Sequence, residues 1–69
     1  MTLDQYRQQF GWSIGEMARK ANIDYSTLKR ALEGESVSAR TARSLAQLIS
    51  EQVGKDVRIH DIEGLQANI

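Results

Sequence analysis

Residues 13–34 have the pattern of two short amphipathic helices joined by a tight turn. Apolar side chains recur at the helical period of about 3.6 residues on both sides of a single break at Asn22 and Ile23. Ala18 is small enough to let the two helices approach, and Ala21 lets the chain turn sharply after it. The segment therefore predicts a helix pair that crosses at a steep angle.

Signals for the start and end of each helix surround the same segment. Ser13 and Glu16 have the spacing of a capping box, in which each side chain bonds the backbone N–H of the other residue. Asn22 falls where the first helix must stop with a positive φ, which Asn tolerates well. Asp24 is placed to cap the second helix and Gly34 to close it. These signals agree on the same two helices.

With these residues the chain resembles the helix-turn-helix regulators of the phage repressor and Cro class, the XRE family, over roughly residues 1–62. The residues that carry the resemblance are Ser13, Ala18, Asn22, Ile23, Leu28 and Gly34. Ile14 departs from the pattern, because the family usually has a Gln there that bonds a DNA phosphate. The resemblance implies that the second helix of the pair is a recognition helix, which enters the major groove of DNA.

The remaining segments predict an all-α fold, a compact five-helix bundle around the helix-turn-helix of residues 13–34. A first helix is expected between Thr2 and Gly11, and a long fourth helix between Ser38 and Gly54, after a polar connector at 35–37.

The last segment, residues 55–65, is ambiguous. Val57 and Ile59 alternate as in a strand, whereas Ile59, Ile62 and Leu65 recur as in a short helix. The family resemblance favours a helix, and a strand remains the alternative.

Length and composition predict one domain that spans residues 1–69. A chain of 69 residues buries only about 60% of its unfolded surface, so its stability is expected to be marginal. It contains no cysteine, which fits a reducing compartment and excludes thiolate metal sites. No apolar run approaches the length of a membrane span and no signal peptide is visible, so we expect a cytoplasmic protein without membrane contact.

The formal net charge is zero, which by itself argues against DNA binding. The charges are unevenly distributed, however. Residues 19–43 hold six Lys and Arg against three Asp and Glu, a net charge of +3 that the rest of the chain balances. Such a polarised molecule can orient itself in the field of the phosphates.

The recognition helix is expected to expose four side chains to DNA bases. If Leu28, Ala31 and Leu32 face the core, the outward residues are Tyr25, Ser26, Lys29, Arg30 and Glu33. Tyr25 and Ser26 lie in the first turn, the part of such a helix that meets base edges. Arg30 can donate two parallel hydrogen bonds to a guanine, and Lys29 suits a single acceptor or a phosphate.

A second set of residues is expected to bind the DNA backbone. Arg40 and Arg43 open the fourth helix, in the region with which the family grips the phosphates, and Ser36 and Ser38 add hydroxyl groups. The whole predicted set comprises Ser13, Arg19, Thr27, Ser36, Ser38, Arg40 and Arg43.

One recognition helix covers few base pairs, so this class binds double-stranded DNA as a homodimer on a pseudo-palindrome. Residues 55–69 are a candidate dimerisation segment. The predicted interface residues are Leu48, Ile59, Ile62 and Leu65, with Ile69 at the end of the chain. The alternative is that these apolar side chains complete a small core.

Other functional classes have less support. His60 is the only histidine, and it lies beside Asp61 in a terminal segment without a carboxylate pair or a phosphate loop around it. We therefore expect neither an enzyme nor a cofactor, metal or small-molecule substrate. The predicted function is a sequence-specific transcriptional regulator, by preference a repressor. The alternative is a protein-interaction module, such as an antitoxin, anti-repressor or anti-activator, which binds a protein partner in place of DNA.

Overall fold

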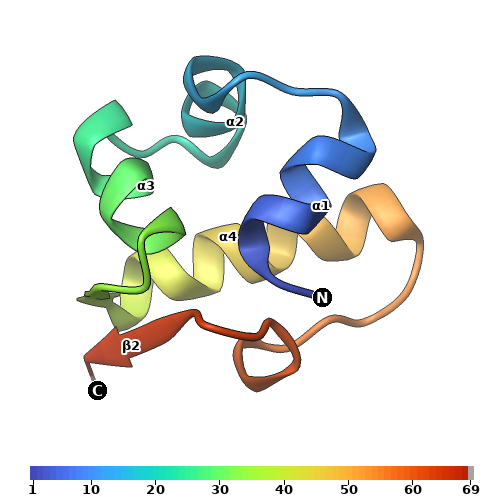
Figure 1. Ribbon diagram of the computed structural model, residues 1–69. Helices are drawn as coiled ribbons and strands as arrows, with labels where there is room; N and C mark the ends of the chain where they lie inside the picture. The colour runs from blue at the N-terminus through green and yellow to red at the C-terminus, as the bar shows by residue number, and fades with distance from the viewer. Residues whose placement is uncertain (69) are drawn as a thin grey trace.

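The computed structural model describes residues 1–68 and contains four α-helices, one turn of 3₁₀-helix and two short strands within that range (Figure 1). The helices are α1 (Leu3–Phe10), α2 (Ile14–Ala21), α3 (Tyr25–Leu32) and α4 (Ala39–Val53). The 3₁₀ turn η1 is Ile59–Asp61, and the strands are β1 (Ser36–Ser38) and β2 (Gln66–Asn68). In the described part of the chain, none of the helices has both the length and the hydrophobicity required to span a bilayer.

The expected all-α bundle of five helices is therefore wrong in its last element. The C-terminal segment forms η1 and then β2, which pairs in parallel with β1 in the register Val37 to Ala67. The expected polar connector at 35–37 contains most of β1, because Val37 is buried between two exposed serines in the alternating pattern of a strand. Helix α4 connects the two parallel strands.

The capping hydrogen bonds at the starts of α1 and α2 are present, as the sequence predicts. At α2, the Glu16 N–H donates to Ser13 Oγ at 3.1 Å and the Ser13 N–H donates to Glu16 Oε1 at 3.4 Å. Asn22 ends this helix in the left-handed conformation, with φ of 58°, and so makes the sharp turn before α3. Asp24 occupies the N-cap position of α3, but its side chain makes no capping hydrogen bond, contrary to the prediction.

The core lies where α4 packs against the N-terminal helices and the C-terminal segment. The largest fully buried side chains are Met17, Leu28, Leu45, Ile49 and Ile62. Ala18 and Ala21 are only 4% and 6% exposed, in agreement with their predicted role at the contact between α2 and α3. This packing fixes the angle of α3 and turns its other face to solvent (Figure 1).

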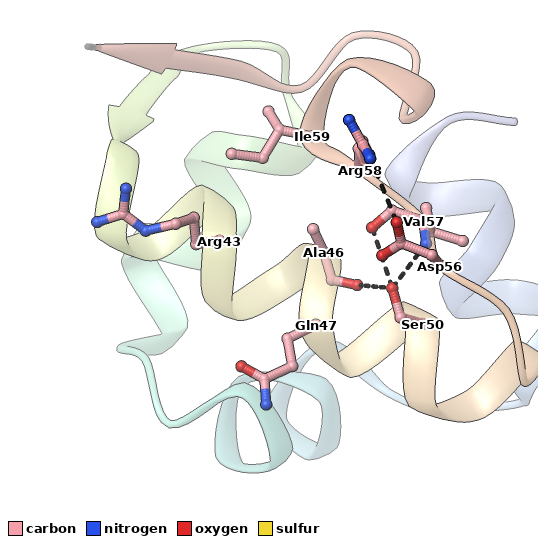
Figure 2. Close-up of a pocket in the computed structure, with 8 residues that line it drawn as sticks. All are labelled: Arg43, Ala46, Gln47, Ser50, Asp56, Val57, Arg58 and Ile59. Carbon is pink, nitrogen blue, oxygen red and sulfur yellow. Dashed lines mark hydrogen bonds and ion pairs between the residues drawn. The ribbon is translucent and has the colours of Figure 1, made fainter.

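The Ser50 hydroxyl anchors the C-terminal segment to α4 (Figure 2). Ser50 Oγ lies 2.8 Å from the Ala46 carbonyl oxygen and 3.0 Å from that of Val57, and it accepts the Val57 N–H at 2.8 Å. At the other end of the segment, the Glu63 N–H donates to the Met1 carbonyl at 3.0 Å. These bonds hold residues 57–63 against both α4 and the N-terminus.

Candidate nucleic-acid interface

The outer face of α3 is polar and open to solvent. Leu28 and Ala31 are 0% and 2% exposed, so one face of the helix is fixed in the core. Tyr25 is 55% exposed and is one of two large apolar or aromatic side chains that the described chain leaves exposed. The other predicted base-reading residues, Ser26, Lys29 and Arg30, are also exposed. The structure therefore places all four predicted side chains on the accessible face of one helix.

A polar groove of about 380 Å³ runs beside this face, between the start of α3 and the start of α4. We call it the polar groove. Its lining residues are Asn22, Ile23, Asp24, Thr27, Ser38, Arg40 and Thr41. The turn of the helix-turn-helix and the first residues of two helices thus meet at one place on the surface.

The backbone N–H groups at the start of α3 favour an anion in the polar groove, because no side chain caps them. The first N–H groups of an α-helix have no partner within the helix. At α4, Ser38 Oγ accepts the Thr41 N–H at 3.1 Å, but at α3 the Asp24 side chain makes no such bond. Unpaired N–H groups at a helix start attract phosphates, and the Arg40 side chain lines the same groove. The exposed Asp24 carboxylate also lines the groove and repels an anion, so Arg40 and the N–H groups act against that one negative charge.

The predicted backbone-binding residues divide into groups. Thr27, Ser38 and Arg40 lie together in the polar groove. Ser13 and Arg19 lie at the start and end of α2, where the Ser13 hydroxyl already caps the helix. Ser36 lies in β1, exposed to solvent and two residues from Ser38.

Arg43 lies apart from the polar groove. It lines a second groove of about 410 Å³ between α4 and residues 56–59, which we call the α4 groove (Figure 2). The two grooves have no lining residue in common.

The basic residues of this region are free of ion pairs. Within residues 1–68 the ion pairs are Arg7 with Asp4, Arg58 with Asp56, and the weak contact of His60 with Asp61. None of them involves the six Lys and Arg of residues 19–43. Lys20 is the one of these with an aromatic contact, with its Nζ 5.2 Å from the centre of the Trp12 ring. The others are available to an external anion.

Thr41 is a groove residue that the sequence reasoning missed. Its hydroxyl accepts a hydrogen bond from Ser38 Oγ at 3.0 Å, and both side chains face the polar groove. The spacing of Ser38 and Thr41, which matches a helix cap and its third residue, could have indicated this pair.

Three of the four predicted dimer residues belong to the core of the chain itself. Leu48, Ile62 and Leu65 are 8%, 2% and 8% exposed, because the C-terminal segment folds back over α4. Their apolar side chains are therefore unavailable as an interface in this fold. Ile59 is half-buried and lines the α4 groove, and Ile69 lies outside the described residues.

A helix pair with an exposed, basic second helix and an adjoining polar groove defines a helix-turn-helix domain of the DNA-binding type. The comparison with known families agrees: residues 3–53, from α1 to the end of α4, match the family model described as Helix-turn-helix, HTH_3. The chain belongs to this XRE-type family of DNA-binding regulators, the class of Cro and the phage repressors. No curated protein and no solved structure matches the chain.

Proposed function

We propose that the chain is a sequence-specific transcriptional repressor that binds a pseudo-palindromic operator as a homodimer. The observation that carries this proposal is the position of Lys29 and Arg30, which are exposed and free of ion pairs on α3, beside a groove suited to a phosphate. A face of this kind offers both base recognition and backbone binding.

In the proposed complex, α3 lies in the major groove. Tyr25 and Ser26 in its first turn contact base edges, and the Tyr25 ring can pack on a thymine methyl group. Arg30, one turn further, donates two hydrogen bonds to guanine O6 and N7, which discriminate against other bases by roughly 1–3 kcal/mol. Lys29 binds a single acceptor.

The polar groove receives a phosphate of the DNA backbone. Arg40 supplies the charge, Thr27 and Ser38 supply hydroxyl groups, and the start of α3 supplies N–H donors. Ser36, Ser13 and Arg19 extend these contacts along the backbone. The Ile14 side chain cannot donate a hydrogen bond to a phosphate, so the start of α2 contributes less to backbone binding than in relatives that have Gln there.

Repression follows from the size of the complex. The Cα atoms of one copy extend over 26 × 23 × 18 Å, so two copies side by side can place their α3 helices in successive major grooves about 34 Å apart. A dimer in that position excludes other proteins from the same stretch of DNA.

A salt titration of DNA binding tests the proposal. Fluorescence anisotropy on a labelled duplex should show an affinity that falls steeply with salt, by roughly a thousandfold or more between 50 and 200 mM for a dimer with 6 to 10 phosphate contacts. Arg40→Gln should lower the slope of log K against log salt by about 1 for each copy. Lys55→Gln, an exposed charge outside both grooves, is the matched control and should leave the slope unchanged.

The second candidate function is the protein-interaction module. The net charge of zero and the apolar Ile14 favour it. A chain of this kind would bind a protein partner with little dependence on salt, and its affinity for DNA would be weak and insensitive to Arg40→Gln.

A further inference from the structure

The exposed stripe of α3 that is proposed to meet DNA ends in a carboxylate. Glu33, the C-cap residue, follows Arg30 by three positions and Ser26 by seven, so the three side chains lie along one side of the helix. All three are exposed. A negative charge therefore lies on the same side of α3 as the side chains proposed to read bases.

The backbone of Glu33 is fixed, and its carboxylate has no ion pair within residues 1–68. The Glu33 N–H donates to the Lys29 carbonyl at 3.1 Å and the Glu35 N–H to the Arg30 carbonyl at 3.0 Å, which closes the helix. Lys29 and Arg30 precede Glu33 at the spacings of helical ion pairs, yet neither pairs with it. A carboxylate at the C-terminal end of a helix also opposes the helix dipole. The stability of α3 therefore does not explain Glu33.

Two further carboxylates lie at the same end of α3. Asp4 and Glu63 line a small pocket of about 150 Å³ together with Glu33, and none of the residues that line it is basic. Arg7 lies 2.9 Å from Asp4 and compensates that charge. Glu63 is exposed and forms no ion pair within residues 1–68, and neither does the Met1 amino group. Glu33 and Glu63 thus make this end of the helix negative.

The start of α3 has the opposite character. Its one carboxylate, Asp24, shares the polar groove with Arg40, and the first N–H groups of the helix are not capped by a side chain. A phosphate is therefore attracted at the start of α3 and repelled at its end.

The length of α3 brings its end to the DNA backbone. Eight residues at about 1.5 Å each span about 12 Å, whereas the major groove is about 8.5 Å deep. When the first turn of α3 meets the base edges, the last turn lies at the rim of the groove, where the phosphates are. Glu33 is then within the distance of about 10 Å over which charges interact at 0.1 M salt.

We infer that Glu33 repels the phosphate backbone and so limits the affinity of the chain for DNA of any sequence. This inference rests on the proposed function, because it assigns a further determinant of the same DNA contact. Phosphate contacts carry affinity without sequence information, so a repulsive charge at the rim weakens binding to random DNA. Stable binding then requires the base contacts of α3 in both half-sites.

Glu33→Gln tests this role, because it removes the charge and keeps the size of the side chain. Fluorescence anisotropy is measured on a random duplex and on a duplex that carries the selected site. The variant should bind both duplexes more tightly than wild type at 50 mM salt. The gain should shrink by about threefold for each copy between 50 and 200 mM, because one charge changes the slope of log K against log salt by about 0.9.

Glu51→Gln is the matched control. Glu51 is exposed near the end of α4, on the other side of the molecule from α3 (Figure 1). Its replacement should leave the affinity and its salt dependence unchanged. A circular dichroism melt verifies that both variants fold, and Glu33→Gln should be at least as stable as wild type, since it removes a charge that opposes the helix dipole.

The preferred sequence separates repulsion from base reading. A Glu side chain can also accept a hydrogen bond from the N4 amino group of cytosine, and its loss would then change one position of the selected site. A Glu33→Gln chain should select the same site as wild type. A changed site, or an affinity at 50 mM salt that is no higher than that of wild type, would overturn the inference. A chain that binds DNA through Arg40 but ignores Glu33→Gln would refute this inference alone, whereas a chain without DNA affinity would refute the proposed function as well.

Discussion

Replacement of Ser50 by alanine should destabilise the chain more than any other single serine substitution on α4. The variant loses the acceptor of the Val57 N–H, at 2.8 Å, and the donor shared between the Ala46 and Val57 carbonyls, at 2.8 and 3.0 Å. Each net hydrogen bond contributes about 0.5–1.5 kcal/mol, and a partly buried N–H without a partner adds to the loss. The expected decrease in the free energy of unfolding is therefore about 1–3 kcal/mol.

Urea and thermal unfolding followed by circular dichroism measure this effect. For a chain of this size, 1 kcal/mol corresponds to roughly 4–8 °C in Tm, so the variant should melt at least about 4 °C below wild type. Ser50→Thr keeps the hydroxyl and should recover most of the loss. Ser44→Ala removes a half-buried serine without a side-chain hydrogen bond in the described chain, and should stay within about 0.5 kcal/mol of wild type. A Ser50→Ala chain as stable as Ser44→Ala would refute the role of this hydroxyl.

Further predictions concern helix ends, and urea unfolding tests them all. Gly15→Ala should stabilise α2 by up to about 1 kcal/mol, because the added Cβ would meet only Ser13 Oγ, at 4.0 Å. Gly54→Ala should destabilise by about 1–2 kcal/mol, because Gly54 has a φ of +75°; equal effects at the two glycines would contradict this reasoning. Ser38→Ala should cost about 1 kcal/mol as a lost cap, and Asp24→Ala less than half of that, since Asp24 makes no capping bond. The opposite order would contradict the assignment of the caps.

The helix-turn-helix could be predicted because its signals are local. The capping box of Ser13 and Glu16 and the turn at Asn22 each involve residues that lie within one or two helical turns of each other. The same periodicity that buries Leu28 also exposes Lys29 and Arg30, so the candidate recognition face follows from the sequence as well.

The C-terminal half of the fold could not be predicted in the same way. Strands β1 and β2 have three residues each, too few for a periodic signal, and they pair across the whole of α4. The burial of Leu48, Ile62 and Leu65 depends on that distant pairing, so in the sequence they were indistinguishable from surface residues of a dimer. The convergence of Thr27, Ser38 and Arg40 in the polar groove likewise depends on how α3 packs against α4.

Selection of binding sites from random duplex DNA tests most directly the claim that the exposed face of α3 reads DNA. We expect an enriched pseudo-palindrome whose half-sites lie about 10 base pairs apart, centre to centre. We also expect that Arg30→Ala loses the preference for one guanine in each half-site while the other positions persist. A selection that enriches no sequence, or one whose enriched site is unchanged by Arg30→Ala, would show that the exposed face of α3 does not read DNA in this way.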